Sequence, residues 1–499
     1  MIISTRSTSM PTQAPLPPLV TSALGLGLEA FVMVRAAVAA GIADARASFE
    51  LTVAPSADDW GFLVLAGVEP LIDALERLRP RADELDWLVS IGVLDTATRR
   101  RMLDARFACD VDTAPEGSVV FSGEAFLTVE GPFWQAQLVG GLVQAALTEA
   151  TAVATRFARM RLASGGARVV EDGAATAYRL GGTPLLARAA FIGGAMATTS
   201  ALAARRHGIP AMALQPARLD LAAGDFERAV RGWLAVAPGD CVVRIEPARA
   251  AKDLQRLAAA VRARASASRH GWDPGKVIVE LPGGDRIGLA RAAAHAFMAA
   301  ELAPPRLLVS GDDVDERLAL ELRAELAHET LFALRGAGPR SGDHAPHPHL
   351  RARYDLVAFE SGGTWSPRLR VGEDVGSSSD PGRKLLVRYV DAAGHPVADV
   401  AHATNERFLR AQTGRYVERA TGLNARLDAA SGAPLRASAM RAGKRATAPE
   451  PASTCRERAA KAVRGLDEGH RRITSPARYP VGMSQSLAAL KAEMLAKVE

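Results

Sequence analysis

Residues 276–292 read KVIVELPGGDRIGLARA, and this stretch decides the fold class of the chain. The apolar run from Lys276 to Leu281 has the length and the β-branched content of a buried strand. Pro282-Gly283-Gly284-Asp285 is a turn-forming sequence, and a helix is expected from Ile287. The stretch is therefore one strand–turn–helix unit, from which parallel sheets are built.

The same rhythm repeats between about residue 185 and residue 345. Further strands are expected at 241–245, 306–309 and 330–334, and each runs into a loop that contains glycine or acidic residues. Successive units of this length predict a parallel sheet, either open or closed into a barrel. In both arrangements ligands bind at the carboxyl edge of the strands, where these loops gather.

The segments on either side of the repeats are organised differently. Residues 19–184 mix helical spacing with short strand-like runs, which predicts an α+β domain, completed by about 350–425. We expect residues 1–18 to be a disordered leader, 426–453 to be a polar connector, and 454–499 to be a C-terminal helical extension.

Composition excludes several classes of protein. The 499 residues are 48% hydrophobic and 23% charged, which is typical of a globular protein. Basic and acidic residues, 61 and 55 in number, are interspersed, so no nucleic-acid partner is expected. The most apolar stretch, 19–43, is interrupted by Glu29 and Arg35 and is not expected to enter a membrane. The three cysteines lack CxxC spacing, and the leader lacks a secretory pattern, so a cytoplasmic location is expected.

The loops after the predicted strands are the candidate site. They gather four carboxylates and several glycines; the carboxylates are Glu246, Asp285, Asp312 and Asp313. Glycine lets a backbone approach phosphate, and carboxylates there could hold Mg²⁺ bound to a phosphorylated ligand. Ordinary turns between strands and helices use the same residue types for their geometry alone. The residues leave both interpretations open.

A histidine cluster follows the last predicted strand of the repeats. His344, His347 and His349 are separated by prolines, and their imidazoles could bind a metal. The prolines favour a surface loop instead.

Six motifs follow one another along the chain. They are Val129-Glu130-Gly131-Pro132-Phe133-Trp134-Gln135-Ala136-Gln137-Leu138, Ala189-Ala190-Phe191-Ile192-Gly193-Gly194, His207-Gly208-Ile209-Pro210, Ser310-Gly311-Asp312-Asp313-Val314-Asp315-Glu316, Pro381-Gly382-Arg383-Lys384 and Tyr479-Pro480-Val481-Gly482-Met483-Ser484. Together they resemble the nicotinate phosphoribosyltransferase family. The resemblance runs from about Leu19 to the C-terminus, so it covers nearly the whole chain.

The resemblance implies a fold, a reaction and an assembly. The fold is an irregular α/β barrel of phosphoribosyltransferase type, with a discontinuous α+β N-terminal domain and a helical C-terminal extension. The reaction joins nicotinate to phosphoribosyl pyrophosphate and gives nicotinate mononucleotide for NAD salvage, with ATP hydrolysis coupled through a phosphorylated histidine. Such a site needs a cation for the nicotinate carboxylate, and donors and Mg²⁺ for pyrophosphate. The family completes its active site across a dimer, so a homodimer, or a heterodimer with an active paralogue, is expected.

Two positions depart from the family in ways that bear on its chemistry. The family histidine falls on Ala217 in the register that the resemblance gives, so ATP coupling by the family route is expected to be absent. The arginine of the family's Arg-Leu-Asp-Ser-Gly-Asp motif falls on Glu280. A carboxylate about 4 Å from the nicotinate carboxylate would be repelled by roughly 4 kcal/mol at an effective dielectric constant of 20.

Other ligand positions of the family are replaced as well. Thr21-Ser22-Ala23-Leu24 stands for Thr-Asp-Leu-Tyr, and Asp172-Gly173-Ala174-Ala175-Thr176 stands for Phe-Gly-x-Arg-Arg. The Phe-Arg-Lys stretch is lost around Thr52-Val53-Ala54. Gly336-Ala337-Gly338-Pro339 replaces the Gly-Val-Gly-Thr phosphate loop, and proline supplies neither a hydroxyl nor an N–H group.

Three functions remain open on the sequence. The chain is a nicotinate phosphoribosyltransferase, or a phosphoribosyltransferase for a different base, or a non-catalytic paralogue that regulates or pairs with an active enzyme. The candidate substrate-binding residues are Thr198, Glu246, Glu280, Gly284, Asp285, Ser310, Gly311, Asp312, Gly336 and Gly338. No catalytic residue is assigned, and His207, the imidazole nearest to Ala217 in sequence, is expected to be structural.

Overall fold

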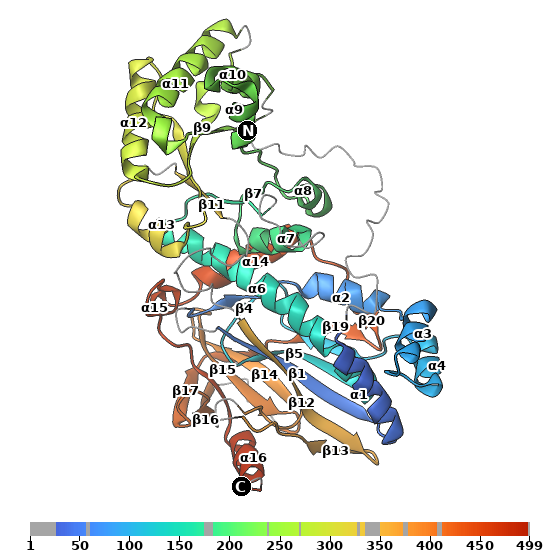
Figure 1. The fold of residues 1–499 in the computed structure, drawn as a ribbon. Helices are drawn as coiled ribbons and strands as arrows, with labels where there is room; N and C mark the ends of the chain where they lie inside the picture. The colour runs from blue at the N-terminus through green and yellow to red at the C-terminus, as the bar shows by residue number, and fades with distance from the viewer. Residues whose placement is uncertain are drawn as a thin grey trace. The chain divides into compact units, whose positions relative to one another are not determined.

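The computed structural model describes residues 26–55, 60–173, 183–236, 239–268, 271–326, 330–334, 350–372, 378–406 and 412–497. By its internal packing the chain divides into two compact units (Figure 1). Unit 1 contains Arg156–His347, and unit 2 contains Pro17–Thr155 together with Pro348–Glu499. Unit 2 is therefore assembled from two segments that unit 1 separates in sequence. The expected leader, 1–18, lies outside the described residues.

A curled parallel sheet forms the centre of unit 1. Its order is β7-β6-β11-β10-β9-β8, and every neighbouring pair is parallel. The strands are β6 (Val169–Glu171), β7 (Ala197–Thr198), β8 (Cys241–Arg244), β9 (Val277–Leu281), β10 (Arg306–Val309) and β11 (Leu331–Leu334). Isolated parallel bridges from Thr198 to Ala211 and from Leu214 to Val242 link the two edge strands through the segment 211–214. The α/β fold with a barrel-like parallel sheet is thus confirmed.

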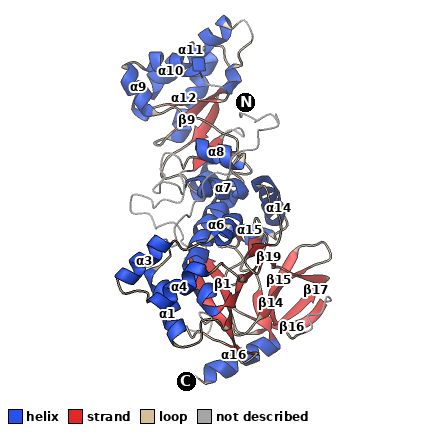
Figure 2. Cartoon of the chain, turned by 90° about the vertical axis from the view of Figure 1, so that its right-hand side faces the viewer, coloured by secondary structure: helices blue, strands red, loops and turns tan. Residues whose placement is uncertain are grey.

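Helices connect these strands, as Figure 2 shows for those around β9. They are α7 (Thr183–Gly193), α8 (Ala201–His207), α9 (Ala217–Ala223), α10 (Phe226–Val236), α11 (Ala250–Ala267), α12 (Arg286–Ala299) and α13 (Glu316–Leu322). The apolar positions of α10 that are buried, Phe226, Ala229, Val230 and Leu234, recur at helical spacing. Helix α12 begins where the Asp285 side chain accepts a hydrogen bond from the backbone N–H of Gly288.

Unit 2 contains two larger sheets and one β-ribbon. The first of the larger sheets is antiparallel, and the second is mixed, because β15 and β21 pair in parallel. The first sheet has the order β13-β12-β1-β5-β3-β19-β20, and its strands are β1 (Arg46–Pro55), β3 (Asp110–Thr113), β5 (Ala125–Pro132), β12 (Leu350–Ser361), β13 (Thr364–Pro367), β19 (Ala437–Arg441) and β20 (Lys444–Arg445). The second has the order β17-β16-β21-β15-β14-β18, and its strands are β14 (Lys384–Val390), β15 (Pro396–Ala403), β16 (Gln412–Glu418), β17 (Asn424–Ala429), β18 (Ser431–Pro434) and β21 (Val481–Ser484). The ribbon pairs β2 (Leu63–Val64) with β4 (Val119–Val120).

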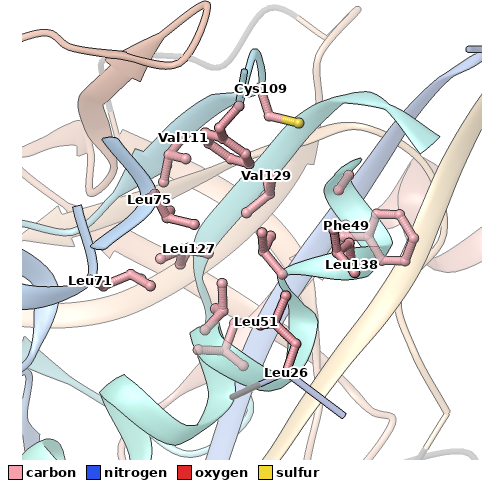
Figure 3. Packing of buried hydrophobic residues seen from close by; sticks show 14 of the residues in the cluster. Leu26, Phe49, Leu51, Leu71, Leu75, Cys109, Val111, Leu127, Val129 and Leu138 are labelled. Carbon is pink, nitrogen blue, oxygen red and sulfur yellow. The ribbon is translucent and has the colours of Figure 1, made fainter. Parts of the chain in front are cut away.

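The helices of unit 2 come from both of its segments. They are α1 (Leu28–Ala39), α2 (Val68–Arg77), α3 (Ala82–Ser90), α4 (Thr96–Asp104), α5 (Phe133–Leu138), α14 (Ala452–Arg464), α15 (Glu468–Arg471) and α16 (Gln485–Ala496), and the boundary at residue 155 falls within α6 (Gly140–Ala163). One face of the first sheet packs against helices to form a large core (Figure 3). Leu51 of β1, Leu127 of β5 and Leu75 of α2 are all fully buried there.

The segment 426–453, expected as a connector, holds ordered strands in the structure. Strand β18 pairs with β14, and β19 pairs with β3, so this stretch contributes to both larger sheets. The expected helical extension, 454–499, contains α14, α15 and α16, but it also supplies β21 between β15 and β16.

Candidate functional site

The barrel of unit 1 carries an apolar layer and, beyond it, a polar layer. Val170, Val242, Ile278 and Leu308, from β6, β8, β9 and β10, belong to one buried cluster. Because side chains alternate along a strand, the residues two positions further on lie on the same face, at the carboxyl end. Those residues are Asp172, Arg244, Glu280 and Ser310. The sequence thus places polar side chains where the strands end and the apolar filling stops.

Glu280 is the best-enclosed charged member of this layer. Its side chain is 4% exposed, and its Oε1 accepts a hydrogen bond of 2.7 Å from the Ser310 hydroxyl. Arg244 lies beside it, because Arg244 and Glu280 are register partners on β8 and β9. The Arg244 Nη1 is 3.6 Å from Glu280 Oε1, and its Nε donates to Glu246 Oε1 at 3.1 Å. One guanidinium is therefore shared between two carboxylates.

Arg286 ties together the loops that follow β9 and β10. Its guanidinium donates to both oxygens of Asp313, at 2.8 and 2.7 Å, and to the backbone oxygen of Ser310 at 2.9 Å. A bidentate pair of this kind fixes orientation as well as distance. Gly311 lies within this contact with a φ of +138°, and a Cβ there would come within 2.8 Å of the Pro282 oxygen. The close approach of the two loops depends on this glycine.

A second carboxyl group lies at the β6–β7 side of the barrel. Glu171 accepts hydrogen bonds from the Thr198 hydroxyl at 2.5 Å and from the Gly173 N–H at 2.6 Å. Burial raises the pKa of Glu171 to about 7. Thr198 is itself fully buried. Its hydroxyl serves this carboxyl group, so the structure gives Thr198 a positioning role toward Glu171.

Neither position 217 nor the neighbouring histidine provides a charged imidazole. Ala217 is the first residue of α9, and Pro216 is its N-cap. His207 is the last residue of α8. Burial, followed by the nearby Arg188 and Arg206, lowers the pKa of His207 to about 4. His207 is therefore neutral at physiological pH, in line with a structural residue.

The described carboxylates do not fit a resident Mg²⁺. Across the residues that the structure describes, no group of three or more His, Cys, Asp or Glu side chains is arranged to hold a metal ion. Glu246 and Glu280 face Arg244, and Asp285 caps α12. Mg²⁺ prefers oxygen ligands that are free to coordinate. These carboxylates are already committed to cationic or N–H partners.

The structure brings most of the predicted site residues together. Seven of them follow β8, β9 or β10 or end those strands: Glu246, Glu280, Gly284, Asp285, Ser310, Gly311 and Asp312. Gly336 and Gly338, like His344, His347 and His349, lie outside the described residues, as do Thr21–Leu24 and residues 174–176. Thr52 to Ala54 belong to β1 in unit 2. The binding roles of these residues stay predictions.

Sequence reasoning missed three polar residues of the barrel, Arg244, Arg286 and Glu171. Arg244 and Glu171 each end an apolar strand, and Arg286 begins a helix directly after Asp285. A charged residue at the end of a buried run was the available signal, because such a position faces the carboxyl edge of the sheet.

A curled parallel sheet with polar strand ends, in a chain that also builds an α+β unit, defines an α/β protein. Comparison with known families and proteins gives the family. The model of the nicotinate phosphoribosyltransferase N-terminal domain matches residues 28–146, and that of the C-terminal domain matches 383–491.

Individual proteins of known sequence match this chain over a larger share of its length. A nicotinate phosphoribosyltransferase of Bacillus subtilis is 26% identical over 71% of this chain and 70% of its own length. The Homo sapiens enzyme of the same name is 25% identical over 90% of this chain and 92% of its own. The crystal structure of human nicotinic acid phosphoribosyltransferase superposes with a TM-score of 0.73 over 94% of this chain and 99% of that one, at 21% identity, so the fold is shared. The chain belongs to the nicotinate phosphoribosyltransferase family.

None of the described helices combines the length and the apolar character that crossing a membrane requires.

Proposed function

We propose that this chain is a nicotinate phosphoribosyltransferase-like protein of NAD salvage that binds phosphoribosyl pyrophosphate, or another nucleotide-like small molecule, but does not accept nicotinate as its base. Buried Glu280, held by Ser310 and Arg244, is the observation that carries the proposal. In the family register this position belongs to the arginine that would face the nicotinate carboxylate.

The charge around Glu280 opposes an anionic base. Arg244 is the adjacent cation, yet Glu246 and Glu280 already compensate its charge. A nicotinate carboxylate about 4 Å from Glu280 would be repelled by roughly 4 kcal/mol at an effective dielectric constant of 20. An amide or amine group on the base would instead donate a hydrogen bond to Glu280.

The loops support retention of a phosphorylated ligand. Gly284 has a φ of +73°, and Gly311 has a φ of +138°, so both loops use backbone conformations that expose N–H and C=O groups without side chains. The Arg286–Asp313 contact holds the β9 and β10 loops in one arrangement. A preformed backbone surface of this kind suits phosphate oxygens.

We do not expect this chain to couple ATP hydrolysis to its reaction through a phosphorylated histidine. It needs an imidazole at position 217, where this chain has alanine. His207, the nearest imidazole in sequence, has a pKa lowered to about 4 and lies at the end of α8. Any turnover is therefore expected to be independent of ATP.

Product analysis with the purified chain tests the proposal. Nicotinate, phosphoribosyl pyrophosphate and Mg²⁺, with and without ATP, should give no nicotinate mononucleotide above the rate without protein. A parallel calorimetric titration of phosphoribosyl pyrophosphate should still show saturable binding. Nicotinate mononucleotide formation would overturn the exclusion of nicotinate, and absence of phosphoribosyl pyrophosphate binding would overturn the retained ligand.

A charge-reversal variant tests whether Glu280 is the residue that excludes nicotinate. In Arg244→Glu/Glu280→Arg the ion pair is kept, and the guanidinium moves to the family position. We expect its affinity for nicotinate to rise at least about tenfold over wild type, which corresponds to about 1.4 kcal/mol. The matched control Arg244→Gln/Glu280→Gln removes both charges and should not reach that affinity. Equal nicotinate binding by the reversed and wild-type chains would show that Glu280 does not face the base.

The replacement at Ala217 favours a second candidate, a non-catalytic paralogue that pairs with an active enzyme. Co-expression with an active member of the family, followed by affinity purification through a tag on this chain, tests for a mixed dimer. A stoichiometric complex with altered turnover supports this candidate, and exclusive recovery of the homodimer or of the monomer contradicts it.

A further inference from the structure

A loop of unit 2 presents an arginine and two hydroxyl groups to solvent. It begins at the end of α15, reads Arg471-Arg472-Ile473-Thr474-Ser475-Pro476, and leads towards β21. All residues from 472 to 480 are described, and none of them belongs to a helix or strand. Arg472, Thr474 and Ser475 are exposed. The function proposed above uses none of these residues.

Hydrogen bonds close this loop at its base. The backbone N–H of Ala477 donates to the Gly469 oxygen at 2.9 Å, and the His470 Nδ1 is 2.8 Å from the Ala477 oxygen. Ser475 has a φ of +47°, a left-handed conformation that turns the chain between these anchors. Thr474 and Ser475 therefore lie in an exposed turn that a second protein can reach.

The residues before Thr474 form a charge pattern that a protein kinase can recognise. Arg471 and Arg472 precede Thr474 by three and two positions. Kinases select their substrates partly by the charges around the acceptor, and guanidinium groups bind carboxylates through paired N–H donors. A kinase with an acidic substrate groove would bind these arginines and so bring the Thr474 hydroxyl to its active site.

Two adjacent basic residues at this spacing before a serine or threonine occur once more in the sequence, in Lys444-Arg445-Ala446-Thr447. Thr447 is exposed as well. Arg445, however, is engaged, because its Nη1 is 2.6 Å from Glu69 and its Nε is 3.7 Å from Glu76. Its side chain is only 14% exposed. The structure thus distinguishes two sites that the sequence pattern leaves equivalent.

The arginines near Thr474 are not engaged in this way. In the part of the chain that the structure describes, Arg471, Arg472 and Arg478 form no ion pair. The Arg471 Nε is buried and has no hydrogen-bond acceptor among those residues. A buried donor without an acceptor is unfavourable. A phosphate group on Thr474 would bring three strong acceptor oxygens into a loop rich in guanidinium groups.

We propose that Thr474 is the phosphate acceptor of an arginine-directed protein kinase. The Thr474 hydroxyl oxygen attacks the γ-phosphorus of ATP bound to the kinase, and the bond from that phosphorus to the β–γ bridging oxygen breaks. ADP leaves, and the hydroxyl proton passes to the catalytic aspartate of the kinase. The proposal does not depend on the reaction at the barrel, since the loop and both arginines belong to unit 2.

Incubation of the full chain with Mg²⁺, ATP and the catalytic subunit of cAMP-dependent protein kinase, an arginine-directed kinase, tests the proposal. Phosphopeptide mass spectrometry should find phosphate on Thr474, with kcat/KM at least about tenfold above that of Thr447. Thr474→Ala should lose this phosphate, and Thr474→Ser should retain a phosphate at position 474. Thr447→Ala is the matched control and should be phosphorylated as the wild type is.

A second pair of variants tests the arginines. Arg471→Gln/Arg472→Gln should lower kcat/KM for phosphorylation at least about tenfold. Arg415→Gln/Arg426→Gln removes two exposed arginines, cross-strand partners on β16 and β17, and should leave it unchanged. If the loop double variant fails to fold, Arg472→Gln, at an exposed position, replaces it.

Three results would overturn the proposal. They are preferential phosphorylation of Thr447 or Ser475, an undiminished kcat/KM in the loop arginine variant, and no incorporation of phosphate into the folded wild-type chain.

Discussion

Two buried glutamates, Glu171 in unit 1 and Glu124 in unit 2, respond to burial in different ways. Glu171 accepts two short hydrogen bonds, and the pKa of its carboxyl group is raised to about 7. Glu124 accepts a side-chain hydrogen bond from none of the described residues. Complete burial, together with the neighbouring Asp399, raises the pKa of Glu124 well above its usual range.

The difference lies in the donors that each unit supplies. At the barrel, a threonine hydroxyl and a loop N–H offset part of the loss of hydration. In unit 2, the guanidinium of Arg388 is 2.5 Å from Asp399 but 3.8 Å from Glu124. Asp399 takes the cation, and Glu124 keeps its proton. A buried carboxyl group is thus stabilised either by hydrogen-bond donors or by staying protonated and neutral.

Removal of the cation in unit 2 should have the largest effect on stability. We expect Arg388→Ala to lower the free energy of unfolding by about 3 to 5 kcal/mol, because Asp399 would stay buried without its charged partner. Urea denaturation of the full chain measures this loss. Arg415→Ala, at an exposed position of β16, is the control and should change stability by less than about 0.5 kcal/mol. A loss in Arg388→Ala no greater than in the control would contradict the role assigned to Arg388.

The proton on Glu124 predicts a pH dependence. Above the ordinary pKa of 4.5 the folded chain holds a proton at Glu124 that the unfolded chain releases, so stability falls as pH rises through and beyond neutrality. The slope is at most about 1.4 kcal/mol per pH unit for one proton. Glu124→Gln has no proton to lose and should flatten this decline in urea unfolding measured across the pH range. Glu29→Gln, at an exposed position of α1, should leave the wild-type slope intact; an identical slope in Glu124→Gln would show that Glu124 is ionised when folded.

Glu171 should show the same sign over a narrower window. The contribution of Glu171 to the free energy of unfolding is greatest below pH 4.5. It falls as pH rises from 4.5 to about 7 and is then constant. The interval corresponds to roughly 3 kcal/mol. Glu171→Gln should remove this decline while leaving that of Glu124 beyond pH 7. Differential scanning calorimetry at several pH values measures both declines. If Glu171→Gln and Glu124→Gln changed stability over the same pH range, the difference between the two glutamates would be contradicted.

The hydroxyl of Ser310 should have the smallest effect. Ser310→Ala removes the 2.7 Å hydrogen bond to Glu280, while the Arg244 contact remains. We expect a loss of about 1 kcal/mol in the free energy of unfolding. Ser431→Ala, at an exposed position in β18, is the matched control. A loss no greater than that of Ser431→Ala would mean that the Ser310 hydroxyl does not stabilise Glu280.

The fold was predictable where local signals agree with tertiary structure. The expected strand at 306–309 is β10, and that at 276–281 is β9, because apolar runs between turn residues have few other solutions. Strands β17 to β20 were not predicted. Alanine and arginine dominate that stretch. Strand β17 pairs with the neighbouring β16 and β20 with β19, while β18 and β19 form through pairing with the distant β14 and β3. Such pairing is long-range information that a local pattern does not contain.

The site was predictable in part for the same reason. Glu280 and Ser310 follow from their place at strand ends. That Arg244 faces Glu280 depends on the register of β8 against β9, and that Glu124 lies beside Asp399 depends on packing between segments remote in sequence. The face on which a side chain lies can be predicted from the alternation of residues along its own strand. Its neighbour on the next strand is known only once the register of the assembled sheet is known.

The divided sequence of unit 2 also sets an order of events during synthesis. Strand β1 pairs with β12, and Ala47 meets Phe359, so the ribosome must add about 300 residues before this partner exists. At about 5 to 20 residues per second, that interval lasts roughly 15 to 60 s. The segment Arg156–His347 of unit 1 is synthesised meanwhile. The nascent chain therefore carries an unpaired edge of β1 through the synthesis of the barrel, and this edge is where a chaperone would be needed.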